Sequence, residues 1–200
     1  MSARRLLFAT GNRGKLAELI RLVEGLPLEV VGSDQVPGLP EVDETGATFA
    51  ENARLKALSG ARASGLWTLA DDSGLSVDAL GGAPGVRSAR YVPGTDRDRY
   101  EALLAAMEPV ADAARGAAFH CALCLASPEG VLLEAEGRCE GRILRAPEGE
   151  GGFGYDPIFG IDRDGPAMAT LSPAQKQGLS HRGAAFRQLR EGLLALLERP

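Results

Sequence analysis

The chain has 200 residues, 44% of them hydrophobic and 24% charged, which is typical of one globular domain that fills its own core. No apolar run approaches the roughly 20 residues that a membrane-spanning helix needs, and the segment after Arg4 and Arg5 is too short for a secretory signal. We therefore expect a cytoplasmic protein with no membrane partner. The net charge of −5, without any basic block, argues against a nucleic-acid polymer as the partner but is compatible with a small anion in a local pocket.

The first stretch with a functional pattern joins a strand to a helix. Residues 6–9 form an apolar run that predicts a buried strand, and an amphipathic helix follows from about Asn12, a good N-cap. Lys15 lies in the first turn of that helix, where the helix dipole disfavours a cation. An anion held by Lys15 and by backbone N–H groups would resolve this conflict. The alternative is an ordinary connection with a solvated lysine, and Leu16 after the lysine excludes a Walker A loop.

Further along, apolar runs and helical periodicity mix without strict alternation. The pattern predicts strands at 28–31, 67–70, 117–126 and 131–135, and helices at 48–64, at 96–107, and after Ser172 and Ser180. A continuation of the last strand past Gly137 to Ile143, bent at a glycine or bulge, is left open. Residues 75–80 are consistent with another strand, and residues 86–92 with extended or irregular chain. This mixture predicts an α/β fold with a mixed β-sheet.

Two adjacent acids, Asp71 and Asp72, follow the predicted strand at 67–70. Because neighbouring residues of a strand point to opposite faces, one carboxylate can reach a site while the other caps backbone N–H groups. Carboxylate oxygens suit Mg²⁺. The alternative is an Asx turn in the sequence Asp-Ser-Gly. Glu41 and the acids at 43–44 either add a metal ligand or form a solvated acidic loop.

Cationic and aromatic side chains recur in the C-terminal part of the chain. Lys176 and Arg182 lie near predicted helix starts, and with His181 they offer donors to carbonyl or phosphate oxygens. A glycine-rich loop presents Phe153, either as a ring that stacks on a flat ligand or as an anchor in the core. Cations near helix starts, combined with the strand-end acid Asp72, are what a Mg²⁺–polyphosphate site needs.

The three cysteines, Cys121, Cys124 and Cys139, do not form a disulfide framework. Cys121 and Cys124 share an apolar predicted strand, where positions i and i+3 point to opposite faces, and no second Cys-x-x-Cys pair is present for a metal. We therefore expect buried free thiols.

Six short stretches run from end to end of the chain: Phe8-Ala9-Thr10-Gly11-Asn12 with Lys15, Thr48-Phe49-Ala50-Glu51-Asn52-Ala53, Ala70-Asp71-Asp72-Ser73-Gly74-Leu75, Gly81-Gly82-Ala83-Pro84-Gly85, Gly152-Phe153-Gly154-Tyr155-Asp156-Pro157 and Ser180-His181-Arg182. Their order and spacing resemble those of the inosine/xanthosine triphosphate pyrophosphatases, also called the HAM1 or non-standard purine NTP pyrophosphatase family. Each stretch alone is weak, but the ordered set is very specific.

The resemblance implies an elongated α/β fold with flanking helices, in which one domain spanning residues 1–200 forms two lobes around a central nucleotide cleft, usually in a homodimer. It also implies hydrolysis of ITP, dITP and XTP to the nucleoside monophosphate and pyrophosphate, with Mg²⁺ as the cofactor. Such an enzyme keeps non-standard purines out of DNA and RNA.

Carried over to this chain, the resemblance implies roles for individual residues. Asp72 is the catalytic proton acceptor and a metal ligand, and Glu41 matches a second metal-binding acid. The triphosphate is expected at Thr10, Gly11, Asn12, Arg13, Gly14 and Lys15, and Ser73 also touches the substrate. The nucleoside end of the pocket is assigned to Phe153, Gly154, Tyr155, Asp156, Lys176, His181 and Arg182.

Three alternatives stay open at this point. A Maf-type pyrophosphatase for modified pyrimidine or thymidine nucleotides would share the α/β architecture, but it is not expected to combine Ser180-His181-Arg182 with this phosphate turn. For a non-catalytic nucleotide-binding module, the acid at Asp72 would be superfluous. An RNA-end or tRNA-binding domain is disfavoured by the acidic charge.

Overall fold

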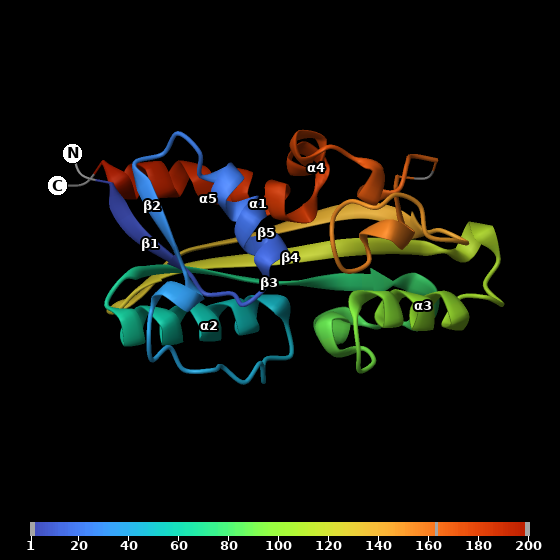
Figure 1. Ribbon diagram of the computed structural model, residues 1–200, viewed down its shortest axis with the longest axis horizontal. Helices are drawn as coiled ribbons and strands as arrows, with labels where there is room; N and C mark the ends of the chain where they lie inside the picture. Colours follow the sequence, from blue (N-terminus) through green and yellow to red (C-terminus); the bar gives the residue numbers. More distant parts are fainter. Residues whose placement is uncertain (1–2, 163, 199–200) are drawn as a thin grey trace. The chain divides into compact units, whose positions relative to one another are not determined.

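The structure is a computed structural model that describes residues 3–162 and 164–198. Its strands are β1 Arg4–Phe8, β2 Leu28–Gly32, β3 Trp67–Val77, β4 Gly116–Ser127, β5 Gly130–Ile143 and β6 Phe159–Ile161, and its α-helices are α1 Arg13–Leu22, α2 Phe49–Ser64, α3 Asp96–Ala106, α4 Pro173–Leu179 and α5 His181–Leu197 (Figure 1). Within the described ranges, no helix combines the length and the apolar character needed to span a membrane.

The six strands form one sheet in the order β2-β1-β3-β4-β5-β6. Strand β1 runs parallel to both of its neighbours, β2 and β3, whereas β5 and β6 pair antiparallel. The sheet is therefore mixed, and the predicted α/β class is confirmed.

Strand β3 corrects one prediction. We expected a strand to end at residue 70, but β3 continues through Asp71 and Asp72 to Val77, so the Asx turn is wrong. The apolar side chains of Leu75 and Val77 are fully buried and continue the strand. The two acids stay within it because basic side chains from other elements meet them, as described below.

Two further segments differ from the sequence pattern. Residues 85–90 form a 3₁₀ helix in place of the expected irregular chain. Strand β6 was not predicted, since three residues are too few for a periodicity to appear.

Helix starts and ends, in contrast, follow local chemistry as predicted. The Thr48 hydroxyl accepts the N–H of Glu51 at the start of α2, and Gly65 ends that helix in the left-handed region with φ 71°. Ser172 caps α4 in the same way through the N–H of Gln175, with Pro173 as the first helical residue.

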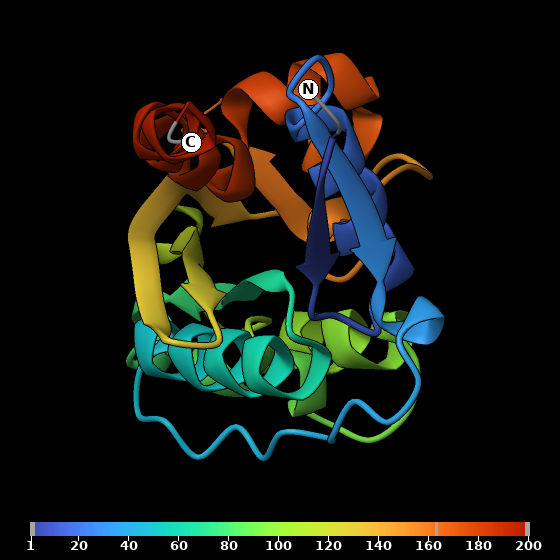
Figure 2. The same ribbon diagram turned by 90° about the vertical axis from the view of Figure 1, so that its left-hand side faces the viewer.

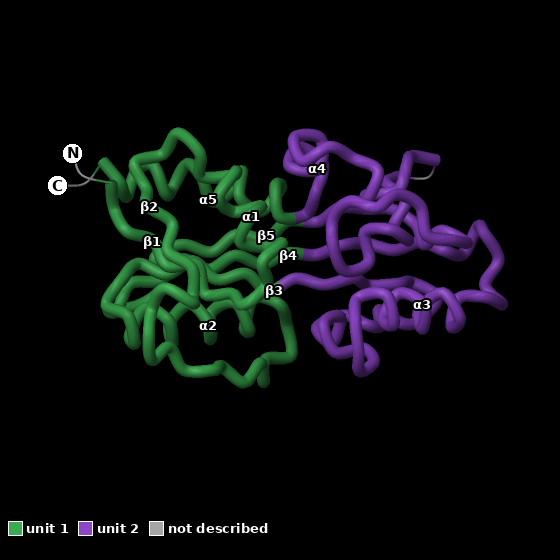
Figure 3. Tube along the Cα trace, in the orientation of Figure 1, with its two compact units in different colours: residues 1–72, 121–137, 182–200 green, residues 73–120, 138–181 purple. Residues whose placement is uncertain are grey.

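The chain divides into two compact units (Figure 3). Unit 1 comprises the residues up to Asp72, Cys121–Gly137 and the residues from Arg182 onward, and unit 2 comprises Ser73–His120 and Arg138–His181. The strands β3, β4 and β5 each contribute residues to both units.

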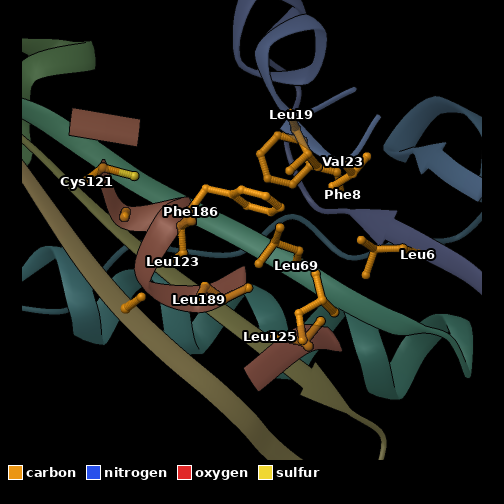
Figure 4. Close-up of a cluster of buried hydrophobic side chains, with 13 residues drawn as sticks. Leu6, Phe8, Leu19, Val23, Leu69, Cys121, Leu123, Leu125, Phe186 and Leu189 are labelled. Atoms are coloured by element: carbon orange, nitrogen blue, oxygen red, sulfur yellow. The ribbon is translucent and has the colours of Figure 1, made fainter. Parts of the chain in front are cut away.

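In unit 1 the sheet is covered on both faces (Figures 1 and 2). Helices α1 and α5 cover one face, where Phe8, Leu69 and Phe186 belong to one cluster of buried side chains (Figure 4). Helix α2 covers the other face with small residues, and its Ala57 packs in a cluster with Ala70. Leu69 and Ala70 are neighbours in β3, so the alternation of a strand sends them to opposite faces.

Unit 2 has its own core. Leu75 and Val77 of β3 pack there with Leu103 of α3. The ring of Phe119 from β4 lies 4.5 Å from the ring of Phe159, centroid to centroid. Helix α3 thus covers its part of the sheet with the apolar side that its sequence predicts.

All three cysteines are free and buried, which confirms the expectation from the sequence. They lie in three different clusters: Cys121 between the sheet and α5, Cys124 on the α2 face, and Cys139 in unit 2. They are part of the cores.

We predict that these thiols react only in the unfolded protein. Burial raises the pKa of Cys124 to about 12 and that of Cys139 to about 11, and burial beside Asp71 also raises the pKa of Cys121. A rise of about three pKa units, as at Cys124, lowers the reactive thiolate fraction about 1,000-fold, and a rise of about two, as at Cys139, lowers it about 100-fold. The reaction with a chromogenic aromatic disulfide at pH 8 should be rapid for all three thiols in urea and very slow in the native protein. Rapid reaction of one native thiol would contradict this assignment.

Candidate functional site

The predicted site residues fall into both compact units. Unit 1 holds residues 10–15, Glu41, Asp72 and Arg182, and unit 2 holds Ser73, residues 153–156, Lys176 and His181. The chain passes between the units after Asp72 and again after His181, in both cases within the predicted site.

The turn between β1 and α1 is held by hydrogen bonds within it and by one from Ser33. The Asn12 side chain accepts the N–H of Lys15 at 3.0 Å, which confirms Asn12 as the N-cap. The Asn12 N–H is donated to Thr10 Oγ1 at 3.1 Å, and the Ser33 hydroxyl donates to the Thr10 carbonyl at 3.1 Å. A Cβ placed on Gly11 would meet nothing within 4 Å, so a ligand can approach this backbone closely.

The Lys15 side chain does not extend into solvent. Its ammonium forms an ion pair with Asp71, and the side chain is only 16% exposed. The same carboxylate accepts hydrogen bonds from Arg182 Nε at 3.0 Å and from the Cys121 thiol at 3.1 Å, and Arg182 also pairs with Glu18. Lys15 and Arg182, assigned to opposite ends of a nucleotide, thus share one buried acid.

The charges in this cluster stabilise one another. Burial alone would raise the pKa of Asp71, but Arg182 and Lys15 outweigh it and hold that pKa well below its usual range. Burial likewise opposes the charge on Arg182, yet the carboxylates of Asp71 and Glu18 raise the Arg182 pKa. Asp71 is therefore a permanent carboxylate with no proton to exchange near neutral pH.

Asp72 points to the other face of β3, toward α2. Lys56 Nζ lies 3.0 Å from its Oδ1, and the Asn52 side-chain amide donates to its Oδ2 at 3.1 Å. Asn52 and Lys56 are one helical turn apart, so α2 presents both donors on one side. Burial raises the pKa of Asp72, and Lys56 opposes that rise. Lys56 Nζ also contacts Glu44 Oε1 at 2.8 Å.

Glu41 lies at the edge of this arrangement. It is exposed and lines a cavity of about 590 Å³ together with Thr10, Gly11 and Lys56. No contact of the Glu41 carboxylate with Asp72 is recorded among the described residues, whereas Glu44 reaches the same ammonium as Asp72.

In unit 2, the glycine-rich loop is organised by Asp156. Its carboxylate accepts the Phe153 N–H at 2.8 Å and forms a buried ion pair of 2.5 Å with Lys176. The Lys176 ammonium lies 4.5 Å from the centroid of the Phe153 ring, a cation–π contact. The Tyr155 hydroxyl donates to the Ser88 carbonyl at 2.9 Å, so Tyr155 anchors the loop in the core.

His181 is buried at the start of α5 and stacks on Phe119, with ring centroids 4.8 Å apart. Ser73 lies within β3 as its first residue in unit 2. Both residues are thereby fixed by the strands of this unit.

The structure brings four further side chains to these predicted site residues, which the sequence did not assign to the site: Glu18, Asn52, Lys56 and Asp71. It also brings in Glu44, one of the acids that the sequence left open as a metal ligand. Glu18 belongs to the polar side of the amphipathic helix α1, but its side chain is only 15% exposed because Arg182 reaches it. A signal existed for Asn52 and Lys56, which are polar residues at helical spacing beside the alanine stripe of α2.

Comparisons with known proteins agree with one another. The model of the Ham1 family matches residues 6–192. The chain is 51% identical over 195 residues to the dITP/XTP pyrophosphatase of Parasynechococcus marenigrum (strain WH8102), covering 97% of each. A HAM1 protein structure from Coxiella burnetii is similar with a TM-score of 0.85 at 40% identity, covering 96% of this chain and 99% of that one. A nucleoside-triphosphatase / dITP/XTP pyrophosphatase structure from Mycobacterium abscessus is similar with a TM-score of 0.72 at 46% identity, covering 92% of this chain and 97% of that one.

The buried cluster around Asp71 leads to a stability prediction. Asp71→Ala leaves the guanidinium of Arg182 and the ammonium of Lys15 without their shared carboxylate, which should lower the free energy of unfolding by about 3–5 kcal/mol. Urea unfolding measures this loss. The control is Glu134→Ala, which breaks the exposed Arg54–Glu134 pair and should cost far less. Similar losses in both variants would show that the buried cluster does not stabilise the fold.

Proposed function

Because the chain belongs to the Ham1 family, we propose that it is a Mg²⁺-dependent pyrophosphatase that hydrolyses dITP, ITP and XTP to the nucleoside monophosphate and pyrophosphate. Relatives named dITP/XTP pyrophosphatase share 50–52% sequence identity with the chain over nearly its full length. The observation that carries the proposal is the Asp72 carboxylate, held by Asn52 and Lys56 on the strand that also binds Lys15 of the phosphate turn. A binding module has no need of such an acid.

The acids around Lys56 fit a divalent cation. Carboxylate oxygens of Asp72 and Glu44 both lie within 3.0 Å of Lys56 Nζ, so a single positive charge can meet both. Among the described residues there is no group of three or more His, Cys, Asp or Glu side chains suited to a metal. Two carboxylates suffice for Mg²⁺, which takes its other ligands from water and substrate phosphate. Asp72 with Glu44, or with the originally assigned Glu41, would hold it.

The proposed reaction follows from the charges of the site. Bound Mg²⁺ would supply Lewis-acid neutralisation of the phosphate oxygens. Asp72 orients a water molecule toward the α-phosphorus and accepts its proton as the new P–O bond forms. The bond between the α-phosphorus and the oxygen that bridges it to the β-phosphate breaks, and that oxygen leaves with the pyrophosphate. Lys15 and the N–H groups of residues 10–14 stabilise the charge on the departing pyrophosphate.

At the nucleoside end, the proposed pocket comprises residues 153–156, Lys176, His181 and Arg182, with Ser73 also in contact with substrate. A 6-oxo purine offers an acceptor where adenine offers an amino donor. Backbone N–H groups and cationic side chains therefore favour hypoxanthine and xanthine over adenine, by up to about 10⁴ when a buried donor would be left without its partner. The homodimer and the cytoplasmic location stay predictions.

A substrate panel tests this function. Pyrophosphate release should be fast from ITP, dITP and XTP, at least about 100-fold slower from ATP and dTTP, and absent in the presence of a chelator. Equal turnover of ATP and ITP would exclude purine discrimination of this kind. Preference for dTTP would favour the Maf-type alternative, and no turnover of any nucleotide would favour the binding module.

Variants at the acids separate their roles. Asp72→Asn should lower kcat at least about 1,000-fold with the fold intact, because the proton acceptor is lost. Glu44→Gln should raise the Mg²⁺ concentration for half-maximal activity about tenfold or more, because a charged ligand becomes neutral. Glu41→Gln is the matched comparison at the exposed position. A larger effect of Glu41→Gln would show that Glu41, and not Glu44, is the second metal ligand. Full activity of Asp72→Asn would overturn the mechanism.

A further inference from the structure

The glycine-rich loop of unit 2 depends on contacts made from outside it. Gly152 and Gly154 both adopt positive φ values, 74° and 63°, so the peptide planes around Phe153 are set by turns and not by a strand ladder. Asp156 fixes the first of these planes by accepting the Phe153 N–H. The next N–H, that of Gly154, points to a different partner.

That partner is Asp96, the first residue of α3. Its Oδ2 accepts the Gly154 N–H at 2.8 Å, across 58 residues of chain. Its other oxygen, Oδ1, accepts Arg99 Nη1 at 2.9 Å, and Arg99 Nη2 donates to the Gly94 carbonyl at 2.8 Å. Each carboxylate oxygen therefore has its own donor, and the orientation of the carboxylate is fixed.

We propose that Asp96 is a positioning residue for the nucleoside end of the site. This inference rests on the proposed function, because residues 153–156 are the part assigned to the nucleoside. Asp96 acts through the loop: by accepting the Gly154 N–H it fixes the peptide that joins Phe153 to Gly154. That peptide sets the tilt of the Phe153 ring beside Lys176.

The chain offers a control on the same helix. Asp98 accepts the Thr95 N–H at 2.6 Å and the Thr95 hydroxyl at 2.7 Å, and thus completes the capping box of α3. Among the residues that the structure describes, the Asp98 side chain bonds to Thr95 and not to the loop. Removing Asp98 weakens the helix start, whereas removing Asp96 also frees the loop.

The test is steady-state inhibition by the two products. Asp96→Ala should raise the KM for ITP and the inhibition constant of IMP about tenfold, as expected for one charged hydrogen bond, and leave that of pyrophosphate unchanged. A change of kcat beyond about twofold is not expected. Arg99→Ala should shift the IMP constant in the same direction by less, because it only loosens the carboxylate.

Each other outcome has a defined meaning. Asp98→Ala should leave both inhibition constants unchanged, although it lowers the melting temperature. If Asp96→Ala behaves like Asp98→Ala, or raises the inhibition constant of pyrophosphate as much as that of IMP, the positioning role is wrong. Should Asp96→Ala fail to fold, Asp96→Asn replaces it; this variant keeps one acceptor and should give a smaller rise in the IMP constant. If the wild-type chain does not hydrolyse ITP, the proposed function itself fails.

Discussion

The constraint on which unit 1 depends is the burial of two adjacent acids in its central strand. Neighbouring residues of β3 face opposite sides, so Asp71 and Asp72 cannot share one counterion. Asp71 meets Lys15 of α1 and Arg182 of α5, and Asp72 meets Lys56 of α2. The helices on both faces are thereby tied to the strand by charge as well as by apolar contact. An uncompensated carboxylate here would oppose folding.

The same alternation gives the two acids different surroundings and different proposed roles. Asp71, on the face of Leu69, is fully buried and permanently ionised, and it orients the cations that the proposed reaction uses. Asp72, on the face of Ala70, has a pKa raised by burial, as suits a group that accepts a proton. The alternation of the strand thus places a structural carboxylate beside the proposed proton acceptor. Moving the strand register by one residue would exchange their surroundings.

How much the sequence predicts depends on the distance over which a feature is encoded. Thr48 and Gly65 define the ends of α2 from within a few residues, and the predicted range 48–64 agrees with both. The end of β3 was misjudged because the partner of Asp71, Arg182, lies 111 residues away. The family resemblance predicted Asp72 as a site residue, but not the hydrogen bond that it receives from Asn52. Local rules describe elements well, and buried charge pairs require the tertiary structure.

The two parts of the proposed site differ in how firmly they are held. The side chain of Asp71, which anchors Lys15 of the phosphate turn, is 0% exposed, whereas that of Asp96, which anchors the glycine-rich loop, is 51% exposed. Exposed charges form weaker contacts because water competes for them. The Gly154 end of the loop, held by Asp96, therefore adjusts at lower cost than the phosphate turn, whereas Asp156, buried against Lys176, holds the Phe153 end. This difference suits the proposed substrates ITP, dITP and XTP, which share the triphosphate but differ in base and sugar.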